Sequence, residues 1–169
     1  MNQTHTIRWL IRRDMPDVTS IEAQSYDCLM GEDGMVDFQR SRNAIGMVAE
    51  VDRQVVGFML YELHKGHIRV VRLCVAKVCR NKGAGSAMIQ RLIDKLAQQQ
   101  RTDIVIEVPE SAVTAQVWLR KREFRCIGTQ ANHYDNGEAM YLMRYSLKTH
   151  DDSVPTWDGV NRITEYLGE

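Results

Sequence analysis

The chain has 169 residues, and its 22 Lys and Arg balance its 22 Asp and Glu, so the formal net charge is zero. A chain of this length fits one domain that buries about 70% of the surface exposed by its unfolded form, which suffices for a core without metal or disulfide support. The balanced charge excludes a general attraction to nucleic acid or to an anionic membrane, although it allows a local basic patch.

The N-terminal quarter is expected to hold one strand and two helices. Residues 7–12 are predicted to form the strand, and Asp14 is a candidate cap for a helix that continues toward residue 26. Gly31 and Gly34 interrupt the helical pattern, so the second, short helix is predicted over residues 36–42.

Three strands are predicted next. Residues 46–51 and 55–63 flank the short polar sequence Asp52-Arg53-Gln54, which indicates a hairpin. Residues 68–75 form a further apolar run after the turn at Lys65-Gly66. Because the three runs are close in sequence, an antiparallel meander is the simplest topology.

The pattern changes to a helix after Gly85. Met88, Ile89, Leu92, Ile93 and Leu96 form one apolar stripe. The short apolar run 104–106 then predicts a buried strand. A strand, a helix and a buried strand in this order form a crossover unit, which predicts that residues 70–75 and 104–107 are parallel neighbours.

The remaining segments predict a helix, a closing hairpin and a tail. The helix spans residues 113–121, and the hairpin pairs 124–130 with 139–147 around Asn136-Gly137. We therefore expect one α/β domain over residues 1–147, with a mixed sheet of six or seven strands flanked by helices. Residues 148–169 are expected to form a C-terminal tail with a short helix, because Val160, Ile163 and Leu167 have helical spacing.

Cysteine usage and hydropathy predict a cytoplasmic protein. The four cysteines include one close pair, Cys74 and Cys79, which does not complete a four-ligand zinc site. Reduced thiols of this kind are typical of the cytoplasm. No segment approaches the roughly 20 apolar residues that cross a bilayer, and residues 1–9 lack a signal-peptide core. We expect no metal and no membrane partner.

The sequence Arg80-Asn81-Lys82-Gly83-Ala84-Gly85 joins a predicted strand to a predicted helix. Its glycines permit positive φ and close approach of a ligand to the main chain. The amides of a first helical turn and the helix dipole favour an anion, and Arg80 can contact phosphate oxygens through two N–H groups. A diphosphate suits this arrangement. The alternative is a glycine-containing turn with solvated basic residues, since neither a P-loop nor a three-glycine dinucleotide motif is present.

Residues 73–88, from Leu73-Cys74-Val75 through the loop to Ser86-Ala87-Met88, resemble the acetyl-CoA motif of the GNAT superfamily of acetyltransferases. Residues 11–18 are similar to that family's first strand and helix start, and Ile106-Glu107-Val108 resembles a strand of the family. The sequence from His133-Tyr134 to Met143 resembles the tyrosine-containing end of RimI-like N-acetyltransferases. The resemblance covers roughly residues 7–147.

The resemblance implies an acetyl-CoA site. In this family two central parallel strands splay apart, and the pantetheine arm of the cofactor inserts between them. Main-chain groups of Leu73, Cys74 and Val75 would pair with that arm. The pyrophosphate would lie on Arg80, Asn81, Lys82, Gly83, Ala84, Gly85, Ser86 and Ala87.

Glu107 and Tyr134 are the catalytic candidates. Transfer to an amine requires a proton acceptor, and Glu107 matches the position of a RimI-like glutamate proposed to act as base, with a solvated or salt-bridged carboxylate as the alternative. The family's usual tyrosine acid is replaced here by Leu119, and Tyr134 is the best substitute. Two further departures are Ala112, where an asparagine is common, and Glu123, where a glycine is common.

Other charged and aromatic residues are weaker candidates. Tyr26, Glu32 and Asp33 are candidates for the acceptor side, and His133 for a titrating group. Basic residues gather at 69–82 and at 120–125; they are either solvated or recognise the cofactor's phosphates. No nucleic-acid module is visible.

We therefore expect an acetyl-CoA-dependent N-acetyltransferase that works by direct attack in a ternary complex. The RimI resemblance favours a protein or peptide N-terminal α-amine as acceptor, such as that of a ribosomal protein, and the chain is expected to be a monomer or homodimer. A small-molecule amine acceptor, a CoA-binding module with little catalysis, and a nucleotide-binding interaction domain are the alternatives.

Overall fold

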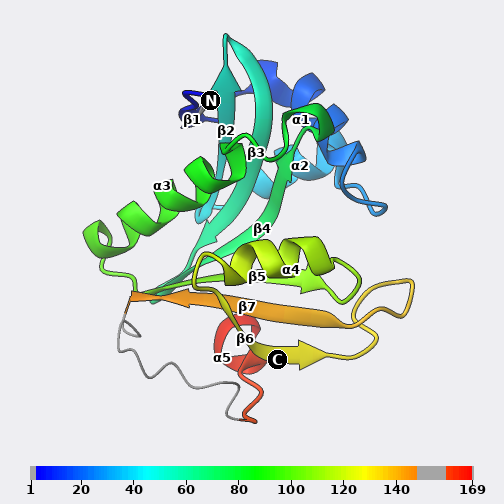
Figure 1. Ribbon diagram of the computed structural model, residues 1–169, viewed down its shortest axis with the longest axis vertical. Helices are drawn as coiled ribbons and strands as arrows, with labels where there is room; N and C mark the ends of the chain where they lie inside the picture. The colour runs from blue at the N-terminus through cyan, green and yellow to red at the C-terminus, as the bar shows by residue number, and fades with distance from the viewer. Residues whose placement is uncertain (1–2, 148–158, 169) are drawn as a thin grey trace. The chain divides into compact units, whose positions relative to one another are not determined.

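The computed structural model describes residues 3–147 and 159–168, which form two compact units. The first unit contains residues 3–64 and 70–95, and the second contains 65–69, 96–147 and 159–168. Seven strands flanked by helices give the described chain a mixed α/β fold (Figure 1). The predicted fold class is confirmed, with the upper of the two predicted strand counts.

The first unit holds most of the helices and the longer strands. In chain order its elements are β1 (Thr6–Trp9), the 3-10 turn η1 (Arg12–Asp14), α1 (Met15–Ala23), α2 (Gly31–Gln39), β2 (Ala44–Val51), β3 (Gln54–Leu63), β4 (His67–Val75), the 3-10 turn η2 (Lys77–Cys79) and α3 (Ala84–Gln98). The first residues of β4 and the last of α3 belong to the second unit. The strand order is β1-β2-β3-β4.

The predicted hairpin is present as β2 and β3. The strands are antiparallel, and Val51 pairs with Gln54 across the two-residue turn. Asp52 and Arg53 in that turn have φ of 49° and 66°. Two successive positive φ values match the twist of antiparallel strands, which explains why so short a connection suffices.

The predicted start of the second helix is wrong. α2 begins at Gly31 and contains Gly34, whereas the pattern had placed the helix from residue 36. The cause is a long-range contact, because the Glu22 carboxylate on α1 accepts the N–H groups of Met30 at 2.9 Å and of Gly31 at 3.2 Å. These bonds satisfy amides at the start of α2 that have no intrahelical acceptor.

Asp14 does not cap α1 through its side chain, contrary to the prediction. Its carboxylate instead accepts two bonds from the Arg8 guanidinium, at 2.8 Å and 2.9 Å, and one from the Ile11 N–H at 2.9 Å. The predicted first strand is also shorter, since β1 ends at Trp9. The buried Asp14 thus ties β1 to the start of α1.

The core of the first unit lies on both faces of its strands. Val48, Phe58, Leu60 and Cys74 pack with residues of α1 and α2 in one buried cluster. Met47 and Met59 pair across β2 and β3 in the alternate register and are also buried. The apolar stripe predicted for α3 is buried at Met88, Ile89, Leu92 and Leu96. In Figure 1, α3 lies on the opposite side of these strands from α1 and α2.

The second unit contains β5 (Asp103–Pro109), α4 (Val113–Arg120), β6 (Arg125–Gln130), β7 (Met140–Ser146) and α5 (Ile163–Leu167). The strand order β5-β7-β6 places β7 between the other two, antiparallel to both. The predicted closing hairpin is therefore confirmed. β5 is longer than the predicted run 104–106, so Glu107 lies inside the strand and not at its end.

The short helix predicted in the tail is present as α5. Ile163, Tyr166 and Leu167 pack against a cluster of Val105, Ile127, Met140 and Leu142. A Cβ on Gly128 would lie 2.4 Å from Asn161 Oδ1 and 2.9 Å from Ile163, so the bare glycine admits the segment. Residues 148–158 and 169 of the predicted tail lie outside the described residues. The predicted boundary between the domain and the tail, after residue 147, falls at the edge of that gap.

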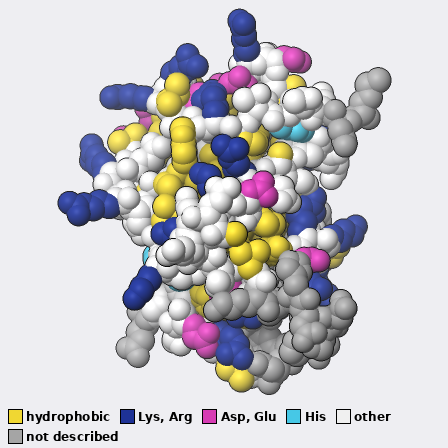
Figure 2. Space-filling view, turned by 90° about the vertical axis from the view of Figure 1, so that its left-hand side faces the viewer, with side chains coloured by type: hydrophobic (Ala, Val, Ile, Leu, Met, Phe, Trp, Pro, Cys, Tyr) yellow, Lys and Arg dark blue, Asp and Glu magenta, His cyan; other side chains and the backbone are white. Residues whose placement is uncertain are grey.

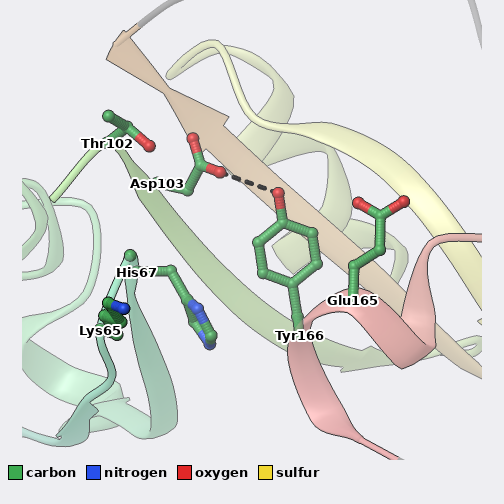
Figure 3. Close-up of a pocket in the computed structure, with 7 residues that line it drawn as sticks. Lys65, His67, Thr102, Asp103, Glu165 and Tyr166 are labelled. Carbon is green, nitrogen blue, oxygen red and sulfur yellow. Dashed lines mark hydrogen bonds between the residues drawn. The ribbon is translucent and has the colours of Figure 1, made fainter.

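Tyr166 anchors α5 to the start of β5 (Figure 3). Its hydroxyl donates to Asp103 Oδ2 at 2.8 Å and accepts from Arg144 Nη1 at 3.1 Å, and its ring meets the edge of His67 at 5.0 Å. An open pocket of about 410 Å³ lies beside these groups. Because Asp103 and Tyr166 in its lining bond to one another, we assign this region to anchoring of α5.

Candidate active site

The loop and helix start at residues 80–87, named the cofactor loop, join η2 to α3, and Gly85 lies inside the helix without the positive φ that its glycine permits. η2 follows β4, and Asn81 and Gly83 then take φ of 60° and 99°. The first helical bond of α3 runs from the Ala87 N–H to the Gly83 carbonyl at 2.9 Å. The amides before Ala87 therefore lie at the positive end of the helix dipole, where an anion is favoured.

Gly57, in β3, lies close to the end of β4 and to Met88 of α3, and its role was not predicted. A Cβ at this position would lie 2.9 Å from the Cys74 carbonyl oxygen and 3.1 Å from Met88 Cε. The missing side chain lets β3 approach both the end of β4 and the start of α3. An isolated glycine inside a strand pattern was the signal that could have indicated this close approach.

The basic residues between positions 69 and 82 have separate partners. Arg72 pairs with Glu22 at 3.4 Å, and Arg69, in the second unit, pairs with Glu107 at 3.1 Å. Arg80 donates from Nε to the Val75 carbonyl at 3.0 Å and from Nη2 to Ser25 Oγ at 2.9 Å. Figure 2 shows Lys and Arg side chains at separate places on one face of the molecule. These cations therefore do not form one continuous basic patch on this face.

Cys74 and Tyr26 lie on the side of β4 that packs against α1. Burial raises the pKa of the Cys74 thiol to about 12 and that of the Tyr26 hydroxyl to about 12. Both groups are therefore protonated at neutral pH. A protonated, buried thiol is a poor nucleophile, so Cys74 does not favour a mechanism through an acetyl-cysteine.

Glu107 lies in the middle of β5 and is held by an ion pair. Arg69 Nη2 donates to Glu107 Oε1 at 3.1 Å, and the Arg69 and Glu107 side chains are 29% and 21% exposed. In the β5–β7 register Glu107 is opposite Leu142, so it shares a face with the cluster on which α5 packs. The salt-bridged carboxylate that was the alternative reading is thus observed, and it also fixes the orientation of the carboxylate.

Tyr134 lies in the loop between β6 and β7 and packs against the same cluster as α5. Its N–H and that of His133 both donate to the Glu138 carbonyl, at 3.2 Å and 3.0 Å. The two rings meet edge to face at 4.8 Å. The Glu138 carboxylate accepts the Ser111 N–H and so ties this loop to the segment before α4, a connection that sequence analysis missed.

The three departures from the family pattern cluster around α4. Leu119 is 1% exposed and belongs to the core, so no proton donor stands at the position of the usual tyrosine. Glu123 has a φ of 67°, which explains why a glycine is common there. The Phe124 N–H donates to the Leu119 carbonyl, and the Glu123 N–H donates to the Arg120 carbonyl. These two bonds form a Schellman motif that ends the helix. Ala112 precedes α4 without a side-chain cap.

The sequence model of the acetyltransferase (GNAT) domain matches residues 28–147, which is well over half of the chain. The chain belongs to the GNAT acetyltransferase family. It is therefore an acyltransferase. An uncharacterized N-acetyltransferase of Methanocaldococcus jannaschii is 28% identical over 138 residues, which cover 81% of this chain and 88% of the relative.

Two solved structures share the fold of this GNAT protein. The ribosomal-protein-S18-alanine N-acetyltransferase from Escherichia coli aligns with a TM-score of 0.77 at 18% identity, over 90% of this chain and 100% of its own. Arabidopsis thaliana Naa50, in complex with the bisubstrate analogue CoA-Ac-MVNAL, aligns with a TM-score of 0.73 at 16% identity, over 84% and 98%. These likenesses confirm the predicted GNAT fold.

Two further findings concern the described part of this GNAT chain. Among residues 3–147 and 159–168, no helix is long and apolar enough to cross a membrane. Within the same residues, no group of three or more His, Cys, Asp and Glu side chains is arranged to hold a metal ion. The predicted splay between residues 70–75 and 104–107 stays a prediction, because one strand lies in each unit.

Proposed function

We propose that this chain transfers the acetyl group of acetyl-CoA to the α-amine of a protein or peptide N-terminus. The observation that carries the acetyl-CoA part is the cofactor loop, where positive φ at Asn81 and Gly83 and the start of α3 form an anion-binding turn. The donor set fits a diphosphate, since main-chain amides, Arg80 and Lys82 belong to one short run. Acetyl-CoA supplies an activated acetyl thioester.

Residues of the cofactor loop and of β4 would bind acetyl-CoA. The amides of Gly83, Ala84, Gly85 and Ser86 bind the diphosphate together with Arg80, Asn81 and Lys82, and Ala87 closes the first helical turn behind them. Main-chain groups of Leu73, Cys74 and Val75 bind the pantetheine arm. Cys74 contributes its main chain, because its thiol is protonated and buried.

Glu107 is proposed as the proton acceptor. It takes the proton of the acceptor ammonium through a water molecule, and the neutral amine then attacks the acetyl carbon directly. Arg69 keeps the carboxylate in one orientation through the 3.1 Å ion pair. Tyr134 is proposed to protonate the departing CoA thiolate, which is itself a tolerable leaving group given a reference thiol pKa of about 8.5.

The choice of acceptor is supported by the two structural neighbours. One is an N-acetyltransferase of a ribosomal protein alanine, and the other binds an analogue that joins CoA to a peptide sequence. We propose a protein or peptide N-terminus as acceptor, with a ribosomal protein as one candidate. We place this reaction in the cytoplasm.

A CoA-binding role with little catalysis is the second candidate. It is favoured by Leu119, which is buried where the family carries its acid. A panel of peptides and small amines separates the candidates. CoA binding without turnover of any acceptor supports the binding role, turnover of small amines alone supports a small-molecule acceptor, and acetylated peptide α-amines support the proposal.

Glu107→Gln tests the catalytic assignment. We expect the kcat/KM for the acceptor to fall by about a hundredfold or more, because general base catalysis contributes ~10²–10⁴, while CoA affinity measured by calorimetry is unchanged. Glu62→Gln is the matched control, since that carboxylate also lies in a strand, is 22% exposed and pairs with His64. Equal rates for the two variants would remove Glu107 from the mechanism. Tyr134→Phe, with Tyr141→Phe as control, tests the acid in the same assay.

A further inference from the structure

Residues 22–31, named the acceptor segment, make several contacts with β4 and the cofactor loop. This segment joins α1 to α2, carries Tyr26 and leads to Glu32 and Asp33, the candidates for the acceptor side. Gln24 Oε1 accepts the Lys77 N–H at 2.8 Å, and Ser25 Oγ accepts Arg80 Nη2 at 2.9 Å. The acceptor segment is therefore bonded to the residues that lead into the cofactor loop.

Glu22 fixes the acceptor segment from within the core. It is fully buried, accepts the N–H groups of Met30 and Gly31, and pairs with Arg72 Nε at 3.4 Å. The Arg72 guanidinium lies 4.6 Å from the centre of the Tyr26 ring. Removing one partner of a buried carboxylate is costly, so these contacts persist. The Ser25–Arg80 bond, in contrast, is exposed, and its acceptor is a neutral hydroxyl that an anion can replace.

Arg80 is shared between two neutral acceptors. Its guanidinium donates to the Val75 carbonyl at 3.0 Å and to the Ser25 hydroxyl at 2.9 Å. Both of these bonds join a charged donor to a neutral acceptor, whereas a bond from arginine to phosphate joins opposite charges and can be bidentate. A diphosphate on the cofactor loop therefore competes for the same guanidinium.

We propose that Ser25 is a positioning residue that acts through Arg80 and couples cofactor binding to the acceptor segment. Diphosphate binding moves the Arg80 guanidinium away from Ser25 and from the Val75 carbonyl. This exchange releases the middle of the acceptor segment and makes the Val75 main chain available to the pantetheine arm. The inference rests on the proposed function, because it requires that CoA binds at the cofactor loop.

The direction in which Ser25→Ala changes the affinity for CoA separates two roles of Ser25. If the Ser25–Arg80 bond breaks on binding, its removal tightens CoA binding by about three- to tenfold, the range set by the net strength of one hydrogen bond. If Ser25 instead holds Arg80 ready for the phosphate, the same variant binds CoA more weakly. A merely structural role for an exposed serine hydroxyl predicts no change.

The experiment measures CoA binding by calorimetry and amide hydrogen exchange of residues 24–31 with and without CoA. In the wild type we expect CoA to increase exchange in residues 24–29. Ser25→Ala is expected to bind CoA three- to tenfold more tightly and to exchange rapidly even without CoA. Ser20→Ala, an exposed serine on α1, is the matched control and should behave as the wild type.

The outcomes distinguish this inference from the proposed function. Absence of CoA binding by the wild type would overturn both. CoA binding that is unchanged or weakened in Ser25→Ala, or that leaves exchange of residues 24–29 unaltered in the wild type, would overturn the coupling alone. A tighter Ser25→Ala complex with lost exchange coupling supports it.

Discussion

The cofactor loop takes its groups from one run of residues, whereas Glu107 and Tyr134 depend on partners far away in the sequence. Main-chain conformation at Asn81 and Gly83 gives the loop its chemistry. Glu107 instead relies on Arg69, and Tyr134 lies on a cluster that α5 shares. Local sequence therefore specifies the first region largely by itself, while the second exists only after long-range packing.

The largest expected effect on stability comes from Gly57, which lies against the end of β4 and Met88 of α3. Gly57→Ala places a Cβ 2.9 Å from the Cys74 carbonyl oxygen, and backbone cannot yield as a flexible side chain does. We expect a loss of about 3 kcal/mol of unfolding free energy, at the upper end for overpacking, together with weaker CoA binding. Urea unfolding and calorimetry measure the two effects.

Gly66→Ala is the matched control for Gly57→Ala. A Cβ at Gly66 meets no atom within 4 Å, so this variant should unfold like the wild type. If Gly57→Ala kept its stability and CoA affinity, the loop would not depend on the close approach of β3. The conformation of the cofactor loop would then depend even less on distant residues than we infer.

Asp14 makes the stability of the first unit depend on pH. The hydrogen bonds from Arg8 hold the pKa of this buried carboxyl below its usual value of 3.8. Its stabilisation is therefore complete above that value and is lost as the pH falls through the lower, folded-state pKa. We expect Asp14→Asn to cost about 2 kcal/mol at neutral pH, with the difference from the wild type vanishing in acid.

Urea unfolding over a pH series measures this difference. Asp17→Asn, at an exposed position on α1, is the control and should shift the curve little. A deficit in Asp14→Asn that stayed constant down to strongly acidic pH would show that the carboxylate charge is not its source.

The structure also shows where sequence reasoning reached its limit. The hairpin at Asp52-Arg53, the α3 stripe and the cofactor loop follow from local pattern, and all three were predicted. The predicted start of α2 is wrong because the Glu22 carboxylate, on another helix, accepts hydrogen bonds from the N–H groups at the true start. The contacts Glu107–Arg69 and Glu138–Ser111 join residues 38 and 27 positions apart, which no local pattern encodes.

In the second unit, Tyr166→Phe tests the anchoring of α5. The variant removes the bonds to Asp103 and from Arg144 and leaves the ring in place. We expect a loss of about 1.5–2 kcal/mol, at the lower end for hydrogen bonds to charged groups. Thermal unfolding measures it, and Tyr141→Phe, on the opposite face of β7, is the control. Equal melting temperatures would mean that apolar packing alone holds α5.

The smallest expected effect is an increase in stability, from a substitution at Glu123. Glu123 ends α4 with a φ of 67°, a conformation that costs L-residues energy and that glycine adopts freely. Glu123→Gly should therefore raise the unfolding free energy by about 1 kcal/mol. Glu110→Gly, at an exposed position without positive φ, should not share the gain. A destabilised Glu123→Gly would indicate that the glutamate side chain contributes more than the strain costs.

A crystal structure of the chain with CoA tests the central claim most directly. We predict the diphosphate at the start of α3, bonded to main-chain amides of residues 83–86, with Arg80 turned from Ser25 toward the phosphates. A diphosphate bound elsewhere, such as on the basic run at residues 120–122, would contradict the assignment of the cofactor loop.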